Sequence, residues 1–321
     1  MLREKLNQKN DMDRVSGIVC VALLVFIAAA MSSCDKSAPE KPAAAVTAQS
    51  AFATPEAAGA AFLEAAKTGD QPGLLAIFGP DGKMALFSGD AVKDKDNLAE
   101  FVAAYNQMHR WREIKLGGEI LLIGADNYPF PIPLAKNPAG QWVFDTAAGK
   151  DEILARRIGK DELTAIATEG AVAEAESRYF SLKKEYAQKF ISDEGKQNGL
   201  YWEVPERQTK SPLNDLRDFA KALGYTNAGD KAQAFGGYFF RILDKQGAKA
   251  KGGAKDYVAN GKMTGGFAVV AYPVEYRNSG IMTFIVGKDG VVYQKDLGES
   301  TFDTAQAMTG YEPDESWKPA L

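Results

Sequence analysis

Histidine and cysteine are scarce in this chain. Histidine occurs once, as His109, and cysteine occurs twice, as Cys20 and Cys34. A structural zinc or iron–sulfur site needs several such ligands close together, so the composition argues against both kinds of site. A metal held by carboxylates alone is left open, but no spacing of residues predicts a metal ligand, and we predict no cofactor.

An excess of positive charge is absent as well. Lysine and arginine total 38 against 42 aspartates and glutamates, which gives a formal net charge of −4. Nucleic-acid binders carry a basic patch that neutralises phosphates, so we predict no nucleic-acid partner. The sequence also lacks a Gly-x-Ser-x-Gly nucleophile motif, and we predict no catalytic residue.

The longest apolar run lies close to the N-terminus. Residues 15–31 follow Arg14 and lead through two serines into Cys34. A basic start, an apolar centre and a small-residue exit are the layout of a secretory signal. The run is shorter than the ~20 residues of a membrane span, which disfavours an uncleaved anchor. We therefore predict a signal peptide over residues 1–33, with translation starting at Met1 or at Met12.

The end of this signal resembles a bacterial lipobox, although Met31 stands where leucine is usual. The resemblance implies that Cys34 is lipidated, becomes the mature N-terminus and anchors the protein to a membrane. Residues 34–53 are rich in alanine and proline and predict a tether. Asp35 resembles the inner-membrane retention signal of enterobacterial lipoproteins. We expect an exported protein on the periplasmic side of the envelope, with the inner membrane suggested by Asp35.

The sequence after the tether predicts an α+β chain of two domains, residues 54–150 and 151–321. Thr54 and Pro55 form a helix start, and Gly69 a helix end. Further helices are expected near residues 74–79 and 98–105, and strands at 109–115, 119–123, 129–135 and 141–145. Helices followed by a curved antiparallel sheet are similar to the nuclear transport factor two-like fold. In that fold the sheet wraps a cone that holds a ligand or is filled by side chains.

Alternating prolines mark the third of these strands. Pro129, Pro131 and Pro133 each lack a backbone N–H, so this segment is expected at a sheet edge or in a polyproline II conformation. Such prolines also prevent an edge from pairing with another chain. A groove that docks a partner is the alternative interpretation.

Four residues of the first domain are candidates for binding a small ligand. An open cone would let His109, Trp111, Trp142 and Asp145 converge in a pocket. The alternative is that the tryptophans belong to the core and that the histidine ends a strand, since a general base needs a positioned partner.

Arg156 and Arg157 are candidates for binding an anion. They lie near the end of a short helix that the sequence predicts from residue 151 to Gly159. Basic residues in the last turn complement the helix dipole, and Glu152 with Arg156 is an i,i+4 pair, so a purely structural role is the alternative.

The second domain reads as a long helix followed by strands. The helix is expected over residues 161–192, a short helix over 212–223, and strands over 237–243, 266–272, 281–286 and 291–294. This order resembles the globular part of type IV pilins and pseudopilins, although the polar start of the helix makes filament assembly doubtful. The lysine-rich segment 244–262 is expected to be a mobile solvated loop, with contact to anionic lipid or a partner as the alternative.

Long sequence strings identify the chain with a family. The strings YPFPIPLAK, GYFFRILDKQG, MTGGFAVVAYPVEY and GIMTFIVGKDGVVYQKDLG resemble the bacterial family called domain of unknown function 2950. The resemblance implies an exported bacterial protein with no established activity.

These observations favour a non-enzymatic role. We expect an envelope lipoprotein that binds an envelope protein or polymer, or helps to assemble a surface structure. Two alternatives are an envelope hydrolase that uses paired carboxylates and a binder of small ligands in the first domain.

Overall fold

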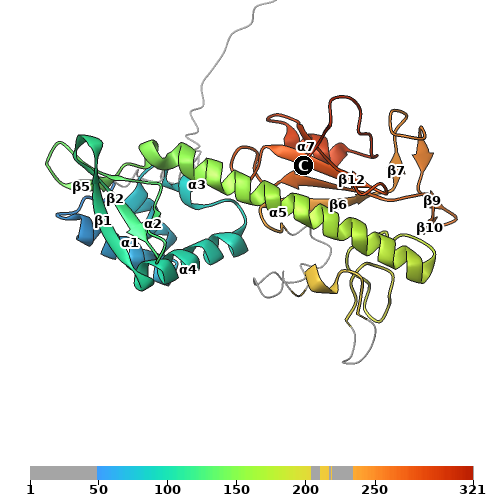
Figure 1. Ribbon diagram of the computed structural model, residues 1–321, viewed down its shortest axis with the longest axis horizontal. Coiled ribbons are helices and arrows are strands. Elements are labelled where there is room, and N and C mark those ends of the chain that lie inside the picture. Colours follow the sequence, from blue (N-terminus) through green and yellow to red (C-terminus); the bar gives the residue numbers. More distant parts are fainter. Residues whose placement is uncertain (1–48, 204–209, 217, 219–233, 321) are drawn as a thin grey trace, which may run out of the picture. The chain divides into compact units, whose positions relative to one another are not determined.

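The computed structural model describes residues 49–203, 210–216, 218 and 234–320 (Figure 1). These residues belong to one unit, Val46–Leu321. Four predictions fall wholly or largely outside the described residues: the signal peptide 1–33, the lipidated Cys34, the retention signal Asp35 and the tether 34–53. The short helix predicted over 212–223 is described in part, and residues 214–216 and 218 are helical. Among the described residues, no helix combines the length and the apolar character needed to cross a bilayer.

Four helices open the described chain. They are α1 (Pro55–Thr68), α2 (Gln71–Phe78), α3 (Gly82–Leu86) and α4 (Ala91–Gln107). The predicted ends of α1 are confirmed: the Thr54 hydroxyl accepts the Ala57 amide at 3.2 Å, and Gly69 ends the helix with φ 65°. The sequence did not predict α3, whose five residues pack against α2 and a later helix.

An antiparallel sheet follows these helices. Its strands are β1 (His109–Ile114), β2 (Gly118–Ile123), β3 (Tyr128–Pro129), β4 (Leu134–Lys136) and β5 (Trp142–Phe144). The order is β1-β2-β4-β5, and β3 pairs with β2 alone. The single strand predicted over 129–135 is therefore wrong. The ladder is interrupted between Pro129 and Leu134, where Pro131 and Pro133 have no N–H to donate.

A single helix, α5 (Thr146–Lys183), runs through the predicted domain boundary near residue 150. The helix end predicted at Gly159 is wrong, as is the second helix start at residue 161. Glycine costs only about 1 kcal/mol relative to alanine inside a helix. Ala165, in the next turns, is buried against Tyr238, Ala271 and Phe284 and holds the helix in place on the next sheet. The helix ends earlier than predicted, because Lys184 takes the left-handed conformation with φ 61°.

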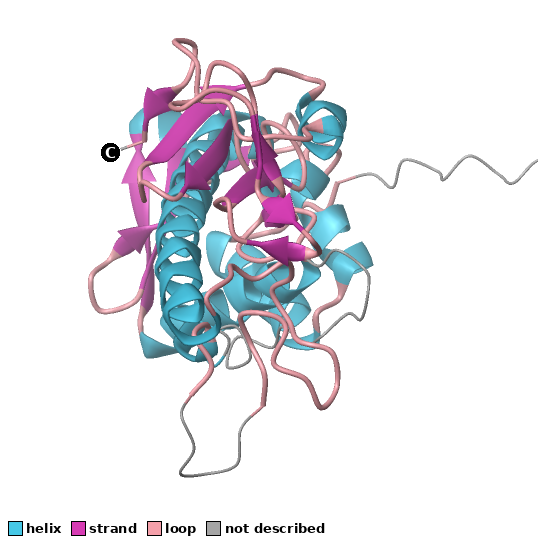
Figure 2. Ribbon diagram, turned by 90° about the vertical axis from the view of Figure 1, so that its right-hand side faces the viewer, coloured by secondary structure: helices cyan, strands magenta, loops and turns pink. Residues whose placement is uncertain are grey.

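The second sheet lies against α5 (Figure 2). Its strands are β6 (Tyr238–Leu243), β11 (Ala268–Pro273), β12 (Met282–Gly287), β13 (Val292–Asp296) and β14 (Lys318–Pro319), in the antiparallel order β14-β13-β12-β11-β6. Phe240 packs with Ala165 of α5, whereas its neighbour Arg241 donates to backbone carbonyls at the end of α7 (Thr301–Ala307). Since adjacent residues of a strand face opposite sides, α5 and α7 cover opposite faces of this sheet.

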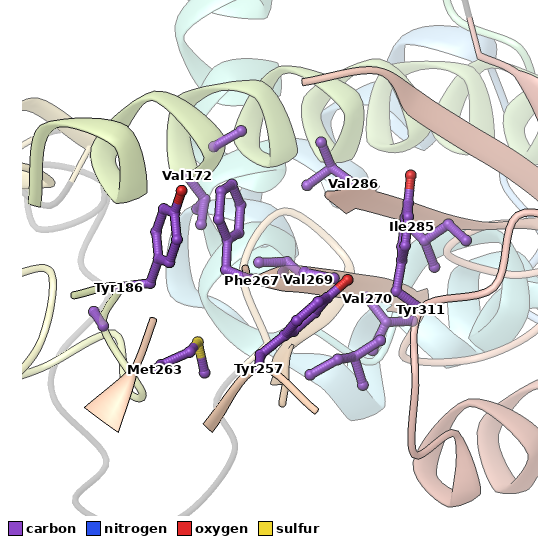
Figure 3. Close-up of a cluster of buried hydrophobic side chains, with 14 of the residues drawn as sticks. Val172, Tyr186, Tyr257, Met263, Phe267, Val269, Val270, Ile285, Val286 and Tyr311 are labelled. Carbon is purple, nitrogen blue, oxygen red and sulfur yellow. The ribbon is translucent and has the colours of Figure 1, made fainter. Parts of the chain in front are cut away.

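The lysine-rich segment is not the plain loop that the sequence predicts. It contains β7 (Lys245–Gln246), β8 (Lys255–Asp256), β9 (Val258–Ala259) and β10 (Lys262–Met263), paired as β7-β8 and β9-β10. Tyr257 and Met263 point into the core and are buried (Figure 3). These two apolar side chains tie the segment to the second sheet.

The buried apolar side chains form separate clusters. One cluster joins α1, α2, α4 and the first sheet around Phe62, Phe101, Phe130 and Phe144. The larger one joins α5 to the second sheet and includes Val172, Phe267, Val269 and Val286 (Figure 3). Helices and antiparallel sheets together confirm the α+β class, whereas the division into residues 54–150 and 151–321 stays a prediction.

Candidate functional site

His109 and Trp111 lie on β1, an edge strand of the first sheet. The exposed His109 ring stacks on Tyr105 at a centroid distance of 3.9 Å, and its Nδ1 lies 3.0 Å from the Tyr105 carbonyl oxygen. Trp111 is half-buried and packs on the first core beside Gly59 of α1, where an added Cβ would lie 3.2 Å from the indole. Both rings therefore contribute to packing at this edge.

Trp142 and Asp145 lie at the other edge of the sheet. The Trp142 backbone exchanges two hydrogen bonds of 2.8 Å with Phe52, and Asp145 accepts the Ala148 amide at 3.1 Å as the N-cap of α5. Because β2 and β4 stand between β1 and β5, the structure does not bring His109 and Asp145 together. Their roles in binding stay predictions.

Arg157 is buried and joins α5 to two other parts of the chain. Its Nη1 donates to the carbonyls of Met84 at 2.8 Å and Phe87 at 3.3 Å, and to the Asn278 side chain. Its Nη2 donates to the Ala85 carbonyl. With its donors used in this way, Arg157 acts as a clamp between the end of α3 and the loop before β12.

Arg156 is positioned differently. Its Nε donates to Glu152 at 2.6 Å, its Nη1 donates to the Pro129 carbonyl at 3.2 Å, and the guanidinium lies 4.8 Å from the Tyr128 ring centroid. The side chain is one-third exposed. Because Glu152 is more than half exposed, its pairing with Arg156 is weakened by solvent, and Arg156 keeps attraction for another anion.

A cavity of about 580 Å³ lies between α4, the β2–β3 connection and α5, and we call it the Arg156 cavity. Its apolar lining includes Leu98, Phe101, Phe130 and Ile153. Arg156 and Lys160 also line it, one helical turn apart on α5, and both are partly exposed to solvent. The cavity thus combines an apolar interior with two cations near solvent.

An ion pair between Lys93 of α4 and Asp161 of α5 lines the same cavity. Asp161 is fully buried, and the Lys93 side chain is 10% exposed. Burial and the positive charge of Lys160 lower the pKa of Lys93 to about 8, and the charges of Asp90 and Asp94 offset part of this shift. The pair fixes α4 to α5.

Of the four acids that line the cavity, Asp126 is exposed and the other three have partners. Asp94 accepts the Ser88 amide at 2.8 Å and the Ser88 hydroxyl at 2.7 Å, Glu100 lies 3.7 Å from Lys160, and Asp161 pairs with Lys93. This arrangement suits the binding of an amphiphile better than acid–base chemistry by two facing carboxylates. In the described ranges, no cluster of three or more histidines, cysteines, aspartates and glutamates is placed to hold a metal.

Sequence reasoning found Arg156 but missed the groups around it. Tyr128, Lys93, Lys160 and Asp161 come from three separate elements. The i,i+4 spacing of Arg156 and Lys160 was the only local signal for a shared helix face. It was hidden by the helix end that we expected at Gly159.

Comparison with known proteins places the chain in a family. A family model described as "Protein of unknown function (DUF2950)" matches residues 49–320, which covers the described part of the chain from its first residue to its last. No curated protein and no solved structure matches.

Proposed function

Because this chain belongs to the DUF2950 family of proteins of unknown function, we propose its role from its own geometry: a non-enzymatic binding module of the bacterial envelope. In this proposal the Arg156 cavity takes a small amphiphile with one acidic group. The observation that carries the proposal is the pairing of an apolar interior with Arg156 and Lys160. Envelope proteins or polymers that carry such a group are the expected partners.

The size and charge of the cavity support an acidic ligand. A volume of about 580 Å³ lies within the range of roughly 300–1,000 Å³ typical of ligand pockets. An acidic head group would contact Arg156 and Lys160, whose present partners Glu152 and Glu100 are more than half exposed. The apolar tail would lie against the side chains from α4 and β2.

Binding of dodecanoate tests this proposal. We expect dodecanoate to bind at least about tenfold more tightly than dodecyltrimethylammonium, which has the same tail and the opposite charge. Arg156→Gln with Lys160→Gln should weaken dodecanoate binding about tenfold, because both cations contact the head group. Isothermal titration calorimetry measures the affinity of the unaltered chain for each probe and the affinity of the double variant for dodecanoate.

Arg178→Gln is the matched control for this experiment. Arg178 is an exposed arginine on α5 that does not line the Arg156 cavity, so its replacement removes charge from the same helix without touching the site. Equal affinities for the two probes, or equal losses in the double variant and the control, would sink the proposed cavity ligand.

We also propose that Cys34 anchors the mature protein, with Asp35 favouring the inner membrane. The signal-like segment before Cys34 supports this proposal. A Cys34→Ala chain should move from the membrane fraction to the soluble periplasmic fraction, since two or more acyl chains are needed for stable anchoring. Immunoblots of fractionated cells measure the shift, and a variant that still sediments with membranes contradicts the anchor.

The two resemblances of the fold are kept as proposals. Helices followed by an antiparallel sheet support a nuclear transport factor two-like domain over residues 54–150. A long helix over an antiparallel sheet supports a pilin-like domain over residues 151–321. Both architectures serve here as rigid supports for the helices that line the cavity.

A further inference from the structure

A second hollow lies on the other side of α4 from the Arg156 cavity, and we call it the α4 groove. Its volume is about 1,080 Å³. Lys95, Ala99 and Val102 line the groove, whereas Asn97 and Ala104 line the Arg156 cavity. At 100° per residue these two sets lie on opposite faces of the helix. The two hollows share Asp94 and Leu98, but the groove opens on the other face of α4.

The floor of the α4 groove is apolar. The end of α1, the α2–α3 region and α4 enclose it. Its large apolar side chains are Leu75, Met84, Phe87, Leu98 and Val102. Met84 is 40% exposed, and the other four are half-buried, so apolar surface stays open to water. This surface is recessed between helices.

The rim of the groove is positive. Lys67, Lys83 and Lys95 are exposed, and within the described part of the chain none of them forms an ion pair. The acids at the groove are engaged: Asp81 with Lys150 at 3.2 Å, Asp94 with Ser88, and Glu275 with Asn278 at 2.9 Å. Three unpaired lysines around an apolar floor stand out on a chain with a net charge of −4.

We propose that the α4 groove docks an acidic amphipathic helix of another envelope protein. Leucine-like side chains at i, i+3, i+4 and i+7 would fill the apolar floor, and flanking carboxylates would contact the three lysines. The groove is lined by α4 from Ala91 to Ala103, a wall of roughly 18 Å, which is the length of between three and four helical turns. A bilayer is a poorer fit, because a flat surface cannot reach side chains recessed between helices.

The test uses the chain of residues 35–321, which keeps the whole unit Val46–Leu321 but lacks the proposed lipid anchor at Cys34, and this chain is the unaltered reference for every variant. The ligand is a synthetic helical peptide of about four turns with leucines on one face and glutamates beside them. A second, basic peptide for comparison carries lysines in place of the glutamates. We expect the acidic peptide to bind at least about tenfold more tightly than the basic one. The triple variant Lys67→Gln, Lys83→Gln, Lys95→Gln should weaken acidic-peptide binding about tenfold at low salt, and high salt should weaken binding to the unaltered chain. Fluorescence anisotropy of labelled peptide measures both effects.

A matched triple variant removes the same charge elsewhere. Lys115→Gln, Lys251→Gln and Lys288→Gln change exposed lysines that do not line the groove, and this variant should bind like the unaltered chain. Ala99→Glu places a carboxylate at an exposed position of the groove wall and should abolish binding, while circular dichroism checks that the helices persist.

Three results would overturn the proposal. The two peptides bind equally, or the two lysine triples lose affinity equally, or the acidic peptide fails to bind at all. Sedimentation with vesicles of anionic phospholipid tests the alternative that the groove contacts a membrane surface. If the chain without the lipid anchor sediments with vesicles and its Ala99→Glu variant does not, the groove contacts a membrane surface and the helix assignment is wrong.

Discussion

Replacing Arg157 by alanine is expected to lower the free energy of unfolding by about 4 kcal/mol, a large effect for one side chain. The reason is the number of buried groups that lose their partner. The guanidinium donates to the carbonyls of Met84, Ala85 and Phe87 and to the Asn278 side chain. Alanine removes this donor from all four acceptors, of which the Phe87 carbonyl keeps the Asn278 amide at 3.1 Å, and leaves a cavity beside them.

Lysine should not restore this stability. Four acceptors surround the planar guanidinium, whereas a lysine ammonium is a point charge with three donors. Burial also lowers the pKa of Arg157, partly offset by Asp94 and Glu275, so the site already disfavours charge and would disfavour a lysine cation more. We therefore expect Arg157→Lys to lose more than half of the stability that Arg157→Ala loses.

Urea unfolding followed by circular dichroism measures the effect, and Arg178→Ala is the control. Arg178 is exposed on the same helix, so its loss should change the free energy of unfolding by about 0.5 kcal/mol or less. If Arg157→Ala unfolds at the same urea concentration as the control, the clamp between α3, α5 and the loop before β12 is not a stabilising feature.

The elements set by local sequence were predicted well. The start and end of α1 follow from Thr54 and Gly69, whose effects act within one helical turn. The strands of the second sheet follow from apolar runs bounded by turns, and β6, β11, β12 and β13 all lie within a few residues of their predicted places. These signals need no knowledge of distant residues.

The errors share one physical cause. Gly159 reads as a helix end, yet α5 continues because its later turns are buried on a sheet formed more than seventy residues further along. The pairing of Lys93 with Asp161 likewise depends on how α4 and α5 meet. Arg156 and Arg157 looked equivalent in sequence, and only the carbonyls at and after α3, up to 73 residues away, distinguish the buried clamp Arg157 from the partly exposed Arg156. Contacts between residues far apart in the sequence therefore decide the length of α5, the Lys93–Asp161 pair and the difference between the two arginines.

Stability is expected to fall as pH rises from 5 to 8, because two buried acids of α5 resist ionisation. Burial raises the pKa of Glu176 from its ordinary value of 4.5 to about 8, and raises the pKa of Glu169 well above that ordinary value. Below pH 4.5 both carboxyls are protonated in the folded and the unfolded chain. Between pH 4.5 and 8 the unfolded chain releases these protons while the folded chain keeps them, so unfolding is favoured.

The expected size of the Glu176 effect is about 5 kcal/mol, reached once the pH exceeds 8. Glu176 is fully buried, so solvent screens this effect little. Its Oε2 accepts the Ala187 amide at 2.8 Å, a bond that a glutamine oxygen also accepts. Glu176→Gln should therefore keep the contact, remove the titrating group and flatten the fall in stability between pH 5 and 8.

Glu169→Gln should flatten the same pH profile independently, since within the described residues no donor reaches either oxygen of Glu169. Glu174→Gln, at an exposed position of the same helix, is the control and should leave the profile unchanged. Urea unfolding of the four chains at pH 5, 6, 7 and 8 supplies the data. A profile for the unaltered chain that is level or rises with pH would mean that Glu169 and Glu176 ionise in the folded protein, and that the face of α5 against the second sheet is wetter than its burial indicates.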